Sequence, residues 1–189
     1  MAPTTWFAQS QARPGTVVQL RSHAWVIREQ INEYNCQLSF DDIPPGVSWP
    51  SYACARFLVD KQGARPAVRA LMRIYIQVPL EGTEAEPPLI RAQQARSEFR
   101  PREQGALEQY HDSGITPRLL DKKLDRQEPW GVVPGGFLLR LVWEIVPGER
   151  LGLGYGESMF WGLPDEERVL IREKFRVGLM YVTPSRLLW

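Results

Sequence analysis

The sequence has little histidine or cysteine and no excess of charge of either sign. Its 189 residues include two histidines and two cysteines, and 23 basic against 22 acidic side chains give a formal net charge of +1. A nucleic-acid-binding protein usually concentrates positive charge on one patch, and a zinc site needs several histidines or cysteines at close spacing. The composition therefore predicts neither a nucleic-acid-binding protein nor a metal site.

Long apolar runs are missing as well. No stretch approaches the roughly 18 apolar residues of a membrane span, and the first residues lack the basic and apolar segments of a secretory signal. We expect a cytoplasmic protein with no membrane contact. Cys36 and Cys54 both lie in strand-like runs. They are predicted to be reduced, buried thiols, and a disulfide is the less favoured alternative.

The chain does have the composition of one globular domain, with 43% hydrophobic and 24% charged residues. Its clearest strand runs over 68–78, where apolar residues alternate with Arg69, Leu71, Arg73, Tyr75 and Gln77. Val68, Ala70, Met72, Ile74, Ile76 and Val78 are predicted to share the opposite face. Shorter strand-like runs are 17–20, 34–40, 52–59 and the stretch that begins at 119, and the apolar run 137–146 is typical of a central strand.

Two helices complete the pattern. Pro101 suits the first residue of a short helix with Ala106, Leu107 and Tyr110 on its apolar side. A second helix is predicted from Pro164, with a buried stripe formed by Ile171, Phe175 and Leu179. The order of strands and helices predicts an α+β fold. We expect residues 1–50 to form an N-terminal extension with short strands and residues 51–189 to form the main domain. The two parts are predicted to fold as one globular unit.

Several stretches together resemble a family of fungal protein-kinase-like proteins that are related in shape to aminoglycoside and choline phosphotransferases. They are CARFLV (54–59), ALMRIYIQVP (70–79), RAQQA (91–95), TPRLL (116–120), VPGGF (133–137), VWEIVPG (142–148) and FWGL (160–163). The resemblance covers roughly residues 50–189. It implies an antiparallel sheet like that of a kinase small lobe, with one inserted helix and a C-terminal helix.

In that family a lysine on the third strand pairs with nucleotide phosphates and with a glutamate on the next helix. The matching positions here are Arg73 and Glu103. An arginine at a phosphate contact is not a conservative replacement. The sequence also has Pro44-Pro45-Gly46 where the family has a glycine-rich loop, and prolines offer no backbone N–H to a phosphate. The segment after the last helix resembles the family's segment that leads to a catalytic acid, but it stops before that acid. Phosphotransfer by this chain alone is therefore not expected. No cofactor is predicted.

Other candidate sites have simpler interpretations. His111 and Asp112 could transfer a proton, or could form a polar helix end where a histidine suits the dipole. Gly152, Gly154 and Gly156 indicate a flexible connector better than a dinucleotide-binding loop. Arg73 and Glu103 could bind an anion or form a structural ion pair, and the second interpretation is favoured.

Three hypotheses for function follow. The first is a non-catalytic kinase-like module that binds a protein partner or a second copy of itself, with Trp161 and Trp189 on its surface. The second is an enzyme without phosphotransfer, such as a cyclase or isomerase of fungal secondary metabolism acting on an apolar small molecule. Its acid and base groups would be Arg73, Glu103 or His111, in a cleft lined by Tyr75, Trp143 and Trp161. A truncated product without a function of its own is the third.

Overall fold

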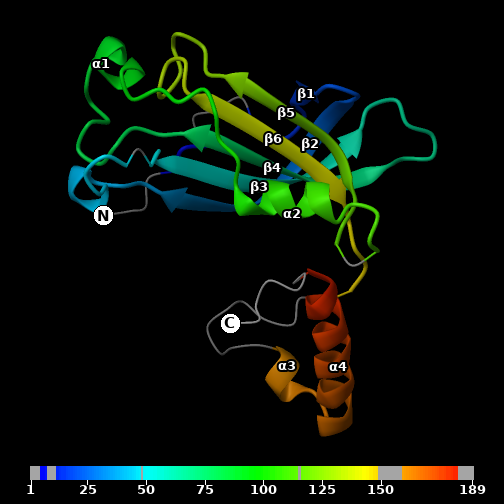
Figure 1. Cartoon of the computed structure of the whole chain (residues 1–189). Coiled ribbons are helices and arrows are strands. Elements are labelled where there is room, and N and C mark those ends of the chain that lie inside the picture. The colour runs from blue at the N-terminus through cyan, green and yellow to red at the C-terminus, as the bar shows by residue number, and fades with distance from the viewer. Residues whose placement is uncertain (1–4, 8–11, 48, 115, 149–158, 183–189) are drawn as a thin grey trace.

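The computed structural model describes residues 5–7, 12–47, 49–114, 116–148 and 159–182, and its main feature is a six-stranded antiparallel sheet (Figure 1). The strands are β1 (Val17–Gln19), β2 (Ala24–Cys36), β3 (Tyr52–Lys61), β4 (Arg69–Gln77), β5 (Leu119–Arg126) and β6 (Phe137–Glu144). The helical segments are η1 (Phe40–Asp42), α1 (Pro88–Ala92), α2 (Arg102–Gln109), α3 (Met159–Gly162) and α4 (Asp165–Val182). The chain thus has the α+β class that the sequence predicts.

The strands lie in the order β1-β2-β3-β4-β6-β5. β1 to β4 are neighbours in sequence and in space, so the segment before residue 51 belongs to the same sheet as the strands after it. The chain then passes through α1 and α2 and returns as β5 at the far edge. β6 lies between β4 and β5, the interior position that its apolar sequence predicts.

The alternation along β4 separates two hydrophobic clusters. Ala70, Met72, Ile74 and Ile76 belong to the larger cluster on one face, here called the first face. Tyr75 belongs to the smaller cluster on the second face, which also includes Leu107 of α2. The predicted pattern is therefore confirmed over β4. Val68 lies before the strand and is half-exposed.

A buried carboxylate joins the two edges of the sheet. Asp121 of edge strand β5 has a side chain only 2% exposed. It accepts hydrogen bonds from the backbone N–H of Ser22 and His23, in the turn between β1 and β2, at 3.2 and 2.9 Å. The indole N–H of Trp25 donates to the same carboxylate at 3.5 Å. Because the partners lie at opposite ends of the strand order, these bonds hold the sheet in a curled form.

The N-terminal segment packs on the first face. Phe7 is buried there, with its ring edge-on to Phe57 at a centroid distance of 6.0 Å. The carboxylate of Glu33 on β2 accepts the backbone N–H of Trp6 at 2.6 Å. β2 itself has two bulges, one between Ile27 and Glu29 and one between Gln30 and Asn32.

Some local predictions were wrong. Cys54 is buried as expected, but Cys36 is exposed because it ends β2 at the rim of the sheet; both thiols are free. β2 begins at Ala24, well before the predicted run 34–40, so this strand is longer than expected. α1 was not predicted, although its first residue, Pro88, is of the type that often begins a helix. The glycines at 152, 154 and 156 lie outside the described residues.

The last helix also differs from its prediction. α4 covers the predicted residues, but its stripe is not buried: Phe175 is 68% exposed and Leu179 is half-exposed. Its first turns contact α3, where the guanidinium of Arg172 lies 5.2 Å from the ring of Phe160 and 6.0 Å from that of Trp161. In Figure 1 the two helices are drawn apart from the sheet.

We predict that Asp121→Ala lowers the free energy of unfolding by about 2–4 kcal/mol, because it leaves the buried indole N–H of Trp25 and the partly buried backbone N–H groups of Ser22 and His23 without this acceptor. Urea unfolding followed by tryptophan fluorescence measures the change. The exposed Asp112, replaced in the same way, is the control and is expected to stay within about 0.5 kcal/mol. Equal effects of the two substitutions would contradict the role given to Asp121.

Candidate functional site

The structure brings Arg73 and Glu103 together between the sheet and α2. The guanidinium Nη1 of Arg73 on β4 donates to the Glu103 carboxylate at 2.8 Å. The hydroxyl of Tyr75 donates to the same oxygen at 2.7 Å. The Arg73 guanidinium also lies over the ring of Trp143 on β6, 5.6 Å from its centroid. Four of the six residues proposed from the sequence therefore form one cluster, here called the Arg73 cluster.

Local sequence explains how the cluster forms. Arg73 and Tyr75 are two residues apart on a strand, so both side chains point to the second face. Glu103 lies in the first turn of α2, where a carboxylate also suits the positive end of the helix dipole. Pro101 sets the extended backbone that precedes the helix.

Burial and the neighbouring groups together set the ionisation of Arg73 and Tyr75. Burial alone would lower the pKa of Arg73, but the adjoining Tyr75 and the Glu103 carboxylate raise it above its ordinary value. Burial raises the pKa of the Tyr75 phenol, and the nearby Glu103 carboxylate raises it further. Arg73 thus remains a cation and Tyr75 a neutral hydrogen-bond donor.

A second ion pair holds the other end of α2. Glu108 accepts hydrogen bonds from the ammonium of Lys122 on β5 and from the side-chain amide of Gln104. These bonds hold the pKa of Glu108 below its ordinary value. Between the two ion pairs, Leu107 is buried in the second-face cluster. The helix is therefore fixed to the sheet by charge at each end and by an apolar contact in the middle.

The remaining two predicted site residues lie elsewhere. His111 follows the end of α2, and its Nδ1 lies 2.9 Å from the carboxylate of the exposed Asp112. Trp161 belongs to α3 and is 59% exposed. In the part of the chain that the structure describes, His111 contacts Asp112, and Trp161 contacts Phe160 and the guanidinium groups of Arg168 and Arg172, away from the Arg73 cluster.

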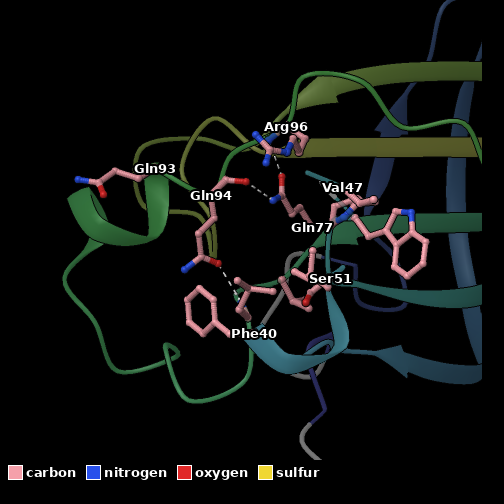
Figure 2. A pocket seen from close by; sticks show the side chains of 12 residues that line it. Phe40, Val47, Ser51, Gln77, Gln93, Gln94 and Arg96 are labelled. Atoms are coloured by element: carbon pink, nitrogen blue, oxygen red, sulfur yellow. Dashed lines mark hydrogen bonds between the residues drawn. The ribbon is translucent and has the colours of Figure 1, made fainter. Parts of the chain in front are cut away.

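A pocket of about 360 Å³ lies at one end of the sheet (Figure 2). Its lining comes from the segment between β2 and β3, from the end of β4 and from the segment after α1. The residues are Phe40, Ile43, Val47, Trp49, Pro50, Ser51, Gln77, Val78, Leu80, Gln93, Gln94 and Arg96. None of them was proposed as a site residue from the sequence.

The polar base of this pocket is a network of two glutamines. The amide of Gln77, which is 2% exposed, donates to the backbone oxygen of Gln94 at 2.6 Å and accepts the backbone N–H of Arg96 at 2.8 Å. Gln94 in turn accepts the backbone N–H of Leu80 at 2.9 Å. Gly136 approaches Gln77 so closely that a Cβ there would lie 2.7 Å from the amide oxygen. Two features of the sequence could have indicated this network. One is a glutamine, Gln77, within the apolar run 70–79, and the other is the pair Gly135-Gly136.

Comparison of the chain with protein-family models, with curated proteins and with solved structures found no match. Within the described residues no helix is long and apolar enough to cross a membrane. The same residues contain no group of three or more histidine, cysteine, aspartate or glutamate side chains placed to hold a metal ion.

We predict that Glu103→Gln destabilises the fold by about 1–3 kcal/mol, because it leaves the half-buried Arg73 without its counter-ion. Chemical unfolding of the variant measures this, with the exposed Glu98→Gln as the matched control. If Arg73 and Glu103 form a structural pair, Tyr75→Phe combined with Glu103→Gln will cost less than the sum of the single changes. Strict additivity would contradict the shared hydrogen-bond network.

The two thiols are expected to differ in reactivity. Burial raises the pKa of the Cys54 thiol, so at a given pH less of it is thiolate, whereas Cys36 is exposed. Alkylation by iodoacetamide at mildly alkaline pH should modify Cys36 at least about tenfold faster than Cys54. Peptide mass spectrometry over time measures both rates, and Cys36→Ser should remove only the fast phase. Comparable rates at both positions would contradict the burial of Cys54.

Proposed function

We propose that this chain is a non-catalytic module with a fold like that of a protein-kinase small lobe, and that it acts by binding another protein or a second copy of itself. The observation that carries the binding role is the set of exposed apolar side chains on α3 and α4. They are Met159, Trp161, Val169, Leu170, Phe175, Val177 and Leu179. So many large apolar groups on two helices are typical of a surface that is covered in a complex.

The order of elements supports the kinase-like part of the proposal. β2, β3 and β4 form an antiparallel meander, α2 comes between β4 and β5, and β6 lies beside β4. In protein kinases a lysine on the third strand pairs with a glutamate on the helix that follows. The contact between Arg73 on β4 and Glu103 on α2 has the corresponding place in this order.

The state of Arg73 supports the absence of catalysis. Its guanidinium binds Glu103 and lies over Trp143, so a phosphate would have to compete with both contacts. The segment between β2 and β3 contains Pro44 and Pro45, which lack the N–H groups of a phosphate-binding loop. These features favour a structural use of the Arg73 cluster.

The acid–base enzyme that the sequence also suggests stays a prediction. His111 pairs with Asp112 beyond the end of α2, whereas Arg73 and Glu103 bind each other. Because His111 is separate from the Arg73 and Glu103 pair, the structure supports an acid–base enzyme less than it supports a binding module. A cytoplasmic location is part of our proposal, since both cysteines are free thiols.

The proposal predicts that Phe175→Glu weakens association by at least about tenfold, because a charge at the contact must lose its water. Sedimentation velocity over a wide range of concentration measures self-association. Retention of proteins from an extract of the source cells on immobilised chain tests for another partner. Glu173→Ala, a polar change on the same helix, is the control and should bind as the unaltered chain does.

Two results together would contradict this function. The first is an unaltered chain that is monomeric at every concentration. The second is an extract in which no protein is retained by the unaltered chain and lost with Phe175→Glu. Circular dichroism of the variant shows whether α4 still forms, so a failure to fold is distinguished from a failure to bind.

A further inference from the structure

We propose that α4 pairs antiparallel with α4 of a second copy of this chain, about a two-fold axis at Ile171. This inference rests on the proposed binding function and names the partner for one side of the exposed surface. That side carries Glu167, Ile171, Lys174, Phe175 and Gly178, and is here called the pairing face. Since successive residues of a helix are about 100° apart, these positions fall within about 100° of its circumference.

α3 leaves the pairing face open. Its rings contact the first turns of α4 through the guanidinium groups of Arg168 and Arg172, which lie on a neighbouring side of the helix. Phe175 is 68% exposed, and Glu167 and Lys174 are exposed as well. Within the described residues neither of these two charged groups takes part in a hydrogen bond or an ion pair. The ring and both charges are therefore accessible to a partner.

The charges of α4 are divided along its length. Its first turn is acidic, with Asp165, Glu166 and Glu167, whereas its middle carries basic residues that include Lys174 and Arg176. The helix dipole explains acidic groups in the first turn. It favours basic groups in the last turn, however, and the last turn of α4 has none. The dipole therefore does not account for the position of the basic residues.

An antiparallel pair of copies brings these opposite charges together. With the axis at Ile171, a residue before Ile171 faces the partner's residue that follows Ile171 by the same number of positions. Glu167 then faces position 175, and the partner's Lys174 is one residue, or about 1.5 Å along the helix, from that point. The symmetry creates this ion pair twice. A parallel pair would instead place the acidic first turns of the two copies side by side.

Ile171 and Phe175 supply the apolar contact of the pair. Phe175 is four positions from the axis, so its ring reaches the partner's Ile171 and the stem of the partner's Glu167. Covering these apolar groups stabilises the dimer, whereas the exposed ion pairs mainly set the orientation of the helices. A single pair of helices about 27 Å long is a small interface, so we expect a dissociation constant in the micromolar range.

Sedimentation velocity of the full chain over roughly 1–200 µM measures the dimer. Phe175→Ala should weaken it by at least about tenfold, because both copies lose the ring. Phe40→Ala is the matched control, since Phe40 is similarly exposed but lies outside α3 and α4, and it should leave the dimer unchanged. A chain that stays monomeric over this range overturns the proposal, and so do equal effects of the two substitutions.

Exchange of charges tests the ion pairs. Glu167→Lys and Lys174→Glu should each weaken the dimer by about tenfold, because each places like charges at both contacts. The variant with both substitutions has opposite charges again and should return to within about threefold of the unaltered chain. Glu173→Lys makes the same change of charge on the far side of α4 and should have no effect. A double variant as weak as the single ones overturns the pairing.

Cysteine crosslinking tests the orientation without altering a charge. In a Cys36→Ser background, Ile171→Cys should form a disulfide between two copies, because the axis brings these positions together. Gly178→Cys should not, since an antiparallel pair separates its two copies by about 21 Å along the helices. A parallel pair would crosslink at both positions. A disulfide at position 178, or none at position 171, overturns the proposal.

Failure of this proposal is distinguishable from failure of the proposed function. A monomeric chain that retains a protein from the extract, and loses it with Phe175→Glu, keeps the binding function and overturns the dimer. A dimer that is insensitive to Phe175→Ala and to the exchange of charges uses another surface, which also overturns the pairing. Circular dichroism of each variant shows whether α4 forms, and crosslinking decides the orientation where a charge variant fails to fold.

Discussion

The curled sheet depends on one carboxylate that is buried between its two edges. Asp121 connects β5 to the turn before β2 through backbone N–H groups and the indole of Trp25. A charge so far from water is tolerated only where several donors surround it. By holding the edges together, these bonds allow a single sheet to enclose much of its own apolar core. Phe7, from the N-terminal segment, fills part of the enclosed first face.

The second face is organised differently, because a helix rather than a second sheet covers part of it. α2 is short, and a helix of its length is not stable in isolation. Its attachment through Glu103, Glu108 and Leu107 is therefore what maintains it. In this arrangement the Arg73 cluster has a mechanical role: it fixes the first turn of α2 to the sheet, while Glu108 and Lys122 fix the other end.

Much of the sheet could be predicted from the sequence, since alternation of side chains is a local property of a strand. The two faces of β4 and the interior position of β6 follow from it. The contact between Arg73 and Glu103 could be proposed only through the resemblance to a known family.

The contacts of Asp121 could not be foreseen, because its partners lie between 96 and 99 positions away and no local pattern connects them. The spacing of apolar residues in α4 predicts a helix with an apolar stripe, but it does not tell whether another element packs on that stripe. In the structure the stripe is exposed. The pocket escaped prediction for a related reason: three separate segments form it.

The bulges of β2 have a consequence for the behaviour of the protein in concentrated solution. β1 pairs with only the first residues of β2, so within the described residues 28–36 no strand lies on that side of β2. A long regular edge would be a template for intermolecular strand pairing and for amyloid-like growth. The extra residues Arg28 and Ile31 break the regular spacing of backbone donors and acceptors along this edge. The irregularity of β2 thus makes this edge a poor template for strand pairing between molecules.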